Sequence, residues 1–349
     1  MDSLTQLVLG AGITAALAPA SQRRRALLLG AALGTLPDLD VIPLALLDVD
    51  AISRVTLHRG ASHSLFVLTL LAPLLWWLAR QRWPDMANRR WLLAIWLTLI
   101  THPLLDALTI YGTQLWWPLM PAPAMWGSVF VIDPLYTLPL LLACLLAWWR
   151  PAARLSQSVL VAALGLSSAY LGWSLYAQQR VDAVAERALA RLGLADAPRF
   201  VTPAPLNTVL WRVVVIDGDR YLQGLYSLAA DGEHMQFSAH PRGRDWLAML
   251  AEHPEVQRYR WFASDFVRIR QEGERLILSD LRMGHEPDYV FSYQVATLGG
   301  HMPRPQRSER VDTTRGPRVV PGELWRRMWQ GAPELRDMES AHTPRPMSP

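Results

Sequence analysis

Residues 58–79 read HRGASHSLFVLTLLAPLLWWLA, in which two histidines, an arginine and two serines stand directly before a predominantly apolar run. The segment 63–79 is close to the ~20 residues that a helix needs to cross a hydrocarbon core of ~30 Å. Polar side chains at the start of such a segment are costly unless they have a partner or a function. The stretch therefore predicts a membrane helix with a chemical site at its outer end.

The composition of the whole chain also predicts a membrane protein. Of its 349 residues 51% are hydrophobic, only 18% are charged and 16 are Trp, and the mean hydropathy is +0.11, which is unusual for a soluble protein of this length. The net charge of +4 comes from Arg, because the chain has no Lys. The arginines flank apolar runs, which argues against nucleic acid as a partner. Cys144 is the single cysteine and is typical of a buried core thiol, so no disulfide framework is expected.

Six apolar segments predict an α-helical integral membrane domain of about six transmembrane helices. They cover residues 4–19, 26–47, 63–79, 91–110, 131–149 and 158–177. We expect three parts: a transmembrane helical domain at 1–177, a small β-rich (α+β) extramembrane domain at 178–300, and a flexible tail at 301–349.

The distribution of arginine predicts the orientation of these helices. Arginines collect in the loops after the first, third and fifth segments, which are therefore expected in the cytoplasm. The other two loops are poorer in positive charge, and the loop 111–130 has no charged residue. Both termini, and with them the β-rich domain, are expected on the outer face of a multi-pass membrane protein.

The sequence beyond residue 177 predicts a different architecture. An amphipathic helix is expected near 178–193, followed by short runs of alternating polarity. Asp217-Gly218 and Glu272-Gly273 fall between such runs, as turns between antiparallel strands do. Within the expected tail, ELWRRMW at 323–329 favours one short helix.

Two ionisable residues in the fourth segment need an explanation. A charge inside a span costs ~2.5–3.5 kcal/mol on insertion scales. His102 and Asp106 are four residues apart, so their side chains lie on one helix face and can point into one space. Pro103 loosens the helix beside them. They could be metal ligands or a buried, hydrogen-bonded pair between helices, and the pair alone does not decide.

Further candidates lie in the second and third segments. Asp38 and Asp40 are two residues apart, so both can serve one site only if the helix breaks at Pro37; otherwise they mark a helix end at the interface. His58 and His63 are five residues apart, which places His58 in a loop and His63 near the first helical turn.

Arg59 lies between these histidines. Together with the start of the following helix, which Ser62 or Ser64 can cap, it would favour an anionic group such as a phosphate.

The predicted topology brings all these residues to one level near the outer face. Three histidines and three carboxylates suit a divalent cation, most of all zinc, although manganese, iron or a metal pair would also fit. Asp133, at the start of the fifth segment, belongs to the same level and could be a ligand or support one.

The chain carries these motifs in a recognisable order: MDSLTQLVLGAGI, GTLPDLDV, HRGASHS, THPLLDALTIYGTQLWWP and VFVIDPLYTLPLL. Over residues 1–145 this set resembles the YdjM/YbcI family of bacterial inner-membrane metal-dependent hydrolases, and more distantly zinc-dependent phospholipase C. The resemblance implies phosphoester chemistry in the inner membrane. It implies a metal shell made of Asp38, Asp40, His58, His63, His102 and Asp106. Many family members have His after the Thr of the opening motif, where this chain has Gln6, so a contact from the first segment is expected to be weaker or absent.

Three functions are compatible with these features. The first is a hydrolase in which a metal-activated water attacks an ester or phosphoester of a lipid or lipid-linked substrate near the outer interface. In it Asp38 or Asp40, if not a ligand, is the candidate general base, and the metal and Arg59 together stabilise negative charge. The second is a transporter that carries metal or protons through the same cluster. The third is a non-catalytic membrane scaffold for the β-rich domain.

Overall fold

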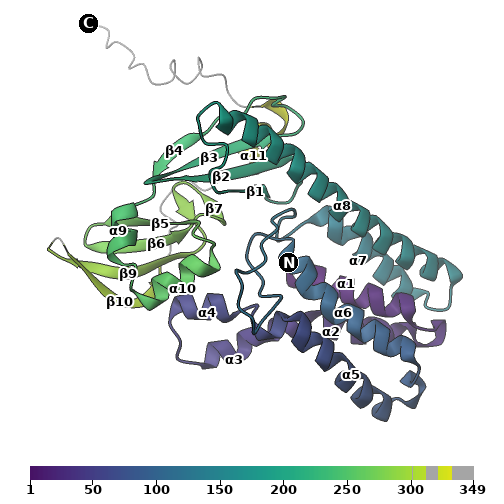
Figure 1. Cartoon of the computed structure of the whole chain (residues 1–349). Helices are drawn as coiled ribbons and strands as arrows, with labels where there is room; N and C mark the ends of the chain where they lie inside the picture. Colours follow the sequence, from purple (N-terminus) through teal and green to yellow (C-terminus); the bar gives the residue numbers. More distant parts are fainter. Residues whose placement is uncertain (301, 312–320, 332–349) are drawn as a thin grey trace, which may run out of the picture.

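The computed structural model describes residues 1–300, 302–311 and 321–331 of the chain. Helices of the N-terminal half form a bundle, and the C-terminal half forms a β-rich domain at one end of that bundle (Figure 1). The long helix α8 leads from the bundle into the β-rich domain. The predicted division into a helical half and a β-rich half is confirmed.

The bundle contains the following helices. They are α1 (Ser3–Leu17), α2 (Arg23–Thr35), α3 (Val41–Leu46), α4 (Ala51–Leu57), α5 (Leu65–Arg82), α6 (Arg89–Ala107), α7 (Pro134–Trp149) and α8 (Arg154–Ala190), with the short 3-10 turns η1 (Ala20–Gln22), η2 (Leu36–Asp40), η3 (Ala61–His63) and η4 (Pro84–Met86) between them.

The structure does not support the prediction of about six transmembrane helices. Among the described residues, two helical stretches are long and apolar enough to cross a membrane, Ala20–Leu46 and Arg154–Ala190. A third exists if Ala51–His63 and Leu65–Arg82, bent by 51°, count as one broken span. The helices α1 and α7 have 15 and 16 residues. At 1.5 Å per residue such helices are ~22–24 Å long, which is shorter than the ~30 Å hydrocarbon core.

Three glycines bring α1 and α2 into backbone contact. A Cβ built on Gly30 would lie 2.2 Å from the carbonyl oxygen of Gly10, and one built on Gly34 would lie 2.4 Å from the carbonyl oxygen of Gln6. Small residues permit such close helix packing inside membrane proteins. The contact fixes the end of α2 against α1 and α6, which is where the candidate site lies.

In its described residues, the β-rich domain contains two four-stranded antiparallel sheets and a two-stranded one. The first has the order β1-β2-β3-β4: β1 (Arg199–Pro203), β2 (Leu210–Asp217), β3 (Arg220–Ser227) and β4 (Ser238–Pro241). The second has the order β10-β9-β6-β5: β10 (Met302–Arg310), β9 (Ser292–Gly299), β6 (Arg275–Asp280) and β5 (Val267–Glu272). The small sheet pairs β7 (Gly284–His285) with β8 (Asp288–Tyr289), and the helices are α9 (Arg244–Met249), α10 (Pro254–Phe262) and α11 (Pro321–Gln330).

Both predicted hairpin turns are present. Asp217 pairs with Arg220 across the first turn, and Glu272 pairs with Arg275 across the second. Gly218 begins the first two-residue loop with a φ of +61°, a conformation that glycine adopts without a steric penalty.

Buried ion pairs hold the β-rich domain together. Arg282 and Asp280 are 2.7 Å apart and almost fully buried. Arg268 donates a hydrogen bond to Glu286. Burial alone would raise the pKa of Glu286, but the hydrogen bonds from Arg268 and Tyr221 outweigh it and lower that pKa below its usual value.

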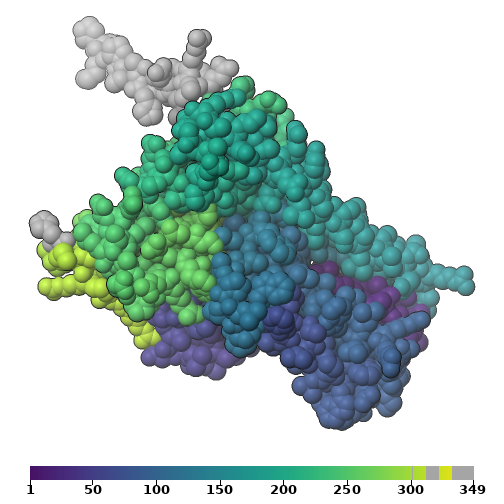
Figure 2. Space-filling view, in the orientation of Figure 1, coloured from purple at the N-terminus to yellow at the C-terminus, as the bar shows by residue number. Residues whose placement is uncertain are grey.

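The helical half and the β-rich domain share one hydrophobic core. Ile52 of α4 is fully buried among side chains of the β-rich domain, with Val55 and Tyr111 packed beside it. Figure 2 shows the loop after α6, in blue, filling the space between the β-rich domain and the helices. The residues just before His58 are therefore anchored in the β-rich domain.

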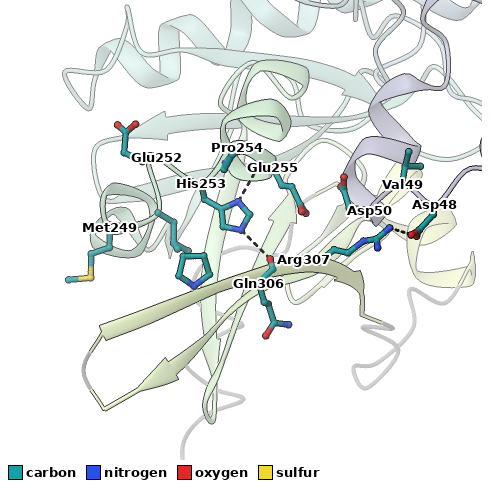
Figure 3. A pocket seen from close by; sticks show the side chains of 12 residues that line it. Asp48, Val49, Asp50, Met249, Glu252, His253, Pro254, Glu255, Gln306 and Arg307 are labelled. Carbon is teal, nitrogen blue, oxygen red and sulfur yellow. Dashed lines mark hydrogen bonds and ion pairs between the residues drawn. The ribbon is translucent and has the colours of Figure 1, made fainter.

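A surface hollow of about 770 Å³ marks the same junction. Asp48 and Arg307 form an ion pair of 2.5 Å across it, and His253 Nε2 donates a hydrogen bond to the carbonyl oxygen of Gln306 (Figure 3). Glu255 accepts a hydrogen bond from the backbone of Ser308. Of these contacts, the Asp48–Arg307 ion pair joins the helical half to β10, whereas the other two lie within the β-rich domain. The hollow therefore lies where the two halves of the chain meet.

Three elements lie at or beyond the predicted domain boundaries. The helix α8 runs through residue 177 without a break, and β10 and α11 lie inside the range predicted as a flexible tail. The short helix expected at 323–329 corresponds to α11. Residues 301, 312–320 and 332–349 of that tail lie outside the described residues. The domain boundaries themselves stay a prediction.

Candidate metal centre

Three separate segments bring together four side chains of the types that bind metal ions. The helix α2 gives way at Leu36 to the 3-10 turn η2, which contains Pro37 and Asp38. His63 ends the 3-10 turn η3, just before α5. His102 and Asp106 come from α6, one helical turn apart.

The four side chains are those of Asp38, His63, His102 and Asp106. Each offers one possible ligand atom, a histidine nitrogen or a carboxylate oxygen, and these four atoms lie within 4.8 Å of one another. His63 Nε2 is 3.1 Å from both His102 Nε2 and Asp106 Oδ2. Asp38 Oδ1 is 3.4 Å from His63 Nε2 and 3.5 Å from His102 Nε2. Ligands ~2.0–2.1 Å from a tetrahedral zinc ion lie ~3.3–3.4 Å from each other. The group can therefore hold a metal ion.

Hydrogen bonds fix which nitrogen of each histidine faces the centre. His102 Nδ1 lies 2.6 Å from the carbonyl oxygen of Gly34, which can only accept, so Nδ1 carries the proton and Nε2 has a free lone pair. His63 Nδ1 lies 2.9 Å from Ser62 Oγ, and Ser62 Oγ donates to Asp40 Oδ2 at 2.6 Å. Ser62 thus accepts from His63 Nδ1, and His63 Nε2 also has a free lone pair.

This arrangement turns four acceptors toward one point. In the described residues, Asp38 Oδ1 is buried and has no hydrogen-bond donor. The two imidazole lone pairs face each other at 3.1 Å without a proton between them. Such a set repels itself unless a cation lies among the four atoms. The donor set of two imidazole nitrogens and two carboxylate oxygens fits a divalent metal.

Asp40 and His58 do not join the four-atom group, which differs from the predicted shell of six. Asp40 accepts hydrogen bonds from Ser62 Oγ and from the backbone nitrogen of Arg59, and its Oδ1 lies 2.7 Å from His58 Nδ1. Both its oxygens are thus occupied by neighbours in the 58–63 loop. Asp40 orients His63 through Ser62, as carboxylates behind metal-binding histidines commonly do.

Arg59 lies at the edge of the centre. Its Nε is 3.3 Å from Asp106 Oδ2. Its guanidinium carbon lies 4.6 Å from the centre of the Tyr111 ring. The positive charge predicted beside the site is therefore present.

The helix α1 contacts the site through Gln6, although Gln6 replaces a histidine found in many family members. Gln6 Nε2 donates hydrogen bonds to Asp106 Oδ1 and to the carbonyl oxygen of His102, each at 3.1 Å. The amino group of Met1 contacts the same oxygen of Asp106. Asp106 thus keeps Oδ2 for the four-atom group while Oδ1 is held by α1.

Asp133 has a structural task away from this group. It caps α7 by accepting hydrogen bonds from the backbone nitrogens of Leu135 and Tyr136, and it also accepts one from Tyr170 at 2.8 Å. The four-atom group does not include it.

The centre opens to the surface on the side of Asp38. The side chains of His63, His102 and Asp106 are 0–1% exposed, whereas that of Asp38 is 21% exposed. The residues after Asp38 along the chain carry exposed apolar side chains, namely Leu39, Val41, Ile42 and Leu46. Exposed apolar side chains therefore follow the most accessible residue of the centre in the chain.

Three contributors were absent from the sequence prediction as parts of the site. They are Ser62, the carbonyl oxygen of Gly34, and Tyr111. The position of Ser62 directly before His63 was a usable signal, although the sequence suggested only a helix cap there. No local pattern indicates a carbonyl group on another helix.

Comparison with known proteins identifies the family of the helical half. The family described as YdjM inner membrane protein matches residues 1–181. The chain belongs to this family. The match covers every residue of the four-atom group and supports a membrane location. No curated protein matches the chain, and no solved structure does.

Proposed function

We propose that this YdjM-family protein is a membrane-bound metal-dependent hydrolase that cleaves an ester or phosphoester of a lipid or lipid-linked substrate. The observation that carries the proposal is the group of four acceptor atoms at mutual distances that suit one divalent ion. The family match supports the membrane setting. Zinc binds imidazole nitrogens and carboxylate oxygens, and its catalytic sites use three such protein ligands with a fourth position open.

In this proposal His63, His102 and Asp106 hold the ion. A bound divalent ion would lower the pKa of a water molecule and polarise the bond to be cleaved. A catalytic zinc site keeps one position open. Asp38 is the most exposed of the four residues, and its Oδ1 has no hydrogen-bond donor among the described residues, so we assign to it the role of general base.

The other residues of the site position these groups. Asp40 was an equal candidate for the base, but both its oxygens already accept hydrogen bonds. It therefore acts on His63 through Ser62. Arg59 provides positive charge beside Asp106, where negative charge would develop on the substrate.

The surroundings of Asp38 support an amphiphilic substrate. Leu39, Val41 and Ile42 are each about half exposed next to the accessible edge of the centre. In a membrane such side chains face acyl chains or other lipid tails. A polar head with a cleavable ester would reach Asp38 while its tail stays in the lipid.

Metal analysis tests the proposal. The full chain, purified in detergent and loaded with zinc, should retain about one ion per chain after dialysis. His102→Ala should lose it, since a ligand is gone, whereas His234→Ala, which changes an exposed loop histidine, should keep it. A wild-type protein that retains no zinc or manganese would refute the mechanism and favour a buried, proton-bridged His–Asp cluster.

The orientation is a second part of the proposal. We place the β-rich domain and the metal centre on the outer face of the inner membrane, because arginines collect in the opposite loops. A single reactive cysteine at position 234, in a chain with Cys144→Ala, would report the side of the β-rich domain. In cells whose outer membrane has been permeabilised, a membrane-impermeant maleimide should label this cysteine. If the cysteine is labelled only after the cells are lysed, the β-rich domain lies on the cytoplasmic side.

A further inference from the structure

Arg59 is buried beside the metal centre with part of its guanidinium group unsatisfied. The residue is 5% exposed. Its Nε lies 3.3 Å from Asp106 Oδ2 in an ion pair without hydrogen-bond geometry, and within residues 1–300, 302–311 and 321–331 no atom accepts a hydrogen bond from its Nη1. A buried charged donor without an acceptor is costly. The group is therefore arranged to receive an acceptor from outside the described chain.

The backbone holds Arg59 in a conformation that is rare for such a residue. Its φ is +61°, in the left-handed region that costs energy for a side chain with a Cβ. Its backbone nitrogen donates to Asp40 Oδ2 at 3.2 Å, and its carbonyl oxygen accepts from the backbone nitrogen of Gln114 at 3.0 Å. These contacts aim the side chain toward Asp106.

The β-rich domain supports the same guanidinium group through Tyr111. Arg59 stacks 4.6 Å from the centre of the Tyr111 ring. The same ring makes edge-to-face contacts with Phe262 of α10 and with Phe291, both at 5.6 Å between ring centres. Stacking on an aromatic face fixes the plane of a guanidinium group and leaves its edge free to donate hydrogen bonds.

We infer that Arg59 forms an anion subsite of the metal centre, which takes a phosphate group and which the β-rich domain holds in position through Tyr111. The planar fork of Arg matches two oxygens of a phosphate. Arg59 Nε lies 3.3 Å from Asp106 Oδ2, so the guanidinium group borders the four-atom group. A phosphate bound to Arg59 by two oxygens would therefore have further oxygens close to the metal centre. The inference deepens the proposed function, since it names the phosphoester as the substrate class.

Binding of inorganic phosphate to the zinc-loaded full chain in detergent tests this inference, with calorimetry as the readout. Wild-type protein should bind one phosphate, and Arg59→Asn should bind it about 10- to 100-fold more weakly. Asn tolerates the left-handed backbone, so the loop should keep its conformation. If Arg59→Asn does not fold, Arg59→Lys is used in its place. Its phosphate affinity should be about threefold or more below that of wild type, because Lys lacks the planar guanidinium group that can bind two phosphate oxygens.

A pair of variants at position 111 tests the support from the β-rich domain. Tyr111→Leu removes the ring and should weaken phosphate binding by about 3- to 10-fold. Tyr111→Phe keeps the ring and should stay within about twofold of wild type. The zinc content of both variants should equal that of wild type, because Tyr111 is not a metal ligand in this proposal. Equal phosphate affinity in the two variants would overturn the role of the ring.

The outcomes separate this inference from the proposed hydrolase. Phosphate binding that depends on Arg59, without hydrolysis of any ester, would support the subsite and refute the hydrolase. Unchanged phosphate affinity in Arg59→Asn, or no phosphate binding by wild type, would overturn the subsite even if hydrolysis is observed. A short-chain phosphatidic acid identifies the source: tighter binding than inorganic phosphate supports a lipid headgroup at the subsite, and equal binding supports a free phosphate group.

Discussion

Replacing Ser62 by Ala should weaken zinc binding although Ser62 does not touch the ion. Its hydroxyl group accepts from His63 Nδ1 at 2.9 Å and donates to Asp40 Oδ2 at 2.6 Å. Without it, His63 Nδ1 loses its acceptor in a fully buried position. An unsatisfied buried donor costs about 1–3 kcal/mol.

The expected loss follows from that cost. Removal of residues that support metal ligands typically lowers metal affinity by about 10- to 100-fold, which is about 1.4–2.7 kcal/mol. Ser62 is only half-buried, so a water molecule can partly replace its hydroxyl group. We therefore expect the lower half of this range, about 10- to 30-fold.

Competition with a chromophoric chelator, using the detergent-solubilised full chain, measures the dissociation constant for zinc. Ser62→Thr retains the hydroxyl group and should stay within about threefold of wild type, and Ser158→Ala, on the exposed surface of α8, should equal wild type. The reasoning is refuted if Ser62→Ala binds zinc as tightly as Ser62→Thr while His102→Ala has lost the ion.

Three further predictions concern stability, measured as the midpoint of thermal unfolding in detergent. Gly30→Ala places a Cβ 2.2 Å from a backbone oxygen of α1 and should destabilise the bundle by about 1–3 kcal/mol or more, whereas Gly165→Ala, with no atom within 4 Å, should be neutral or stabilising; equal effects would contradict the close packing. Zinc at about 100 times its dissociation constant should stabilise wild type by about 2.7 kcal/mol and leave His102→Ala unchanged, and a shift in both would indicate binding elsewhere. The folded-state pKa of Glu286 lies below its ordinary value of 4.5, because hydrogen bonds from Arg268 and Tyr221 outweigh the effect of burial. The stability that Glu286 contributes is therefore complete at pH values above 4.5 and is lost as the pH falls through its lowered pKa. Glu286→Gln should unfold at a lower temperature than wild type at pH 7 and lose less stability on acidification, and parallel pH profiles of the two proteins would refute this.

The part of the site that follows from local geometry could be predicted from the sequence. His102 and Asp106 share a helix face because they are four residues apart, and the structure places both in the four-atom group. Asp38 could join them only through a helix break at Pro37, and a 3-10 turn occurs there. In each case a short-range rule of the backbone determines where the side chain lies.

The roles of Asp40 and His58 could not be predicted in the same way. Spacing brings both near the centre, but it does not distinguish a ligand from a residue that orients one. Asp40 is drawn away from the four-atom group by three donors, among them Ser62 and a backbone nitrogen. The prediction of about six membrane-crossing helices was not supported for a related reason. The length of an apolar run in the sequence does not show where the helix ends.

The division of the chain into a family region and an appended domain does not match the division of its core. The family match ends at residue 181, yet Ile52 of α4 is fully buried in the core of the β-rich domain. Thr56 also accepts a hydrogen bond from Arg258 of that domain. The helix α4 leads directly into the loop that carries His58 and His63. One end of this loop is thus fixed by the β-rich domain and the other by α5, so the geometry of the metal centre depends on both halves of the chain.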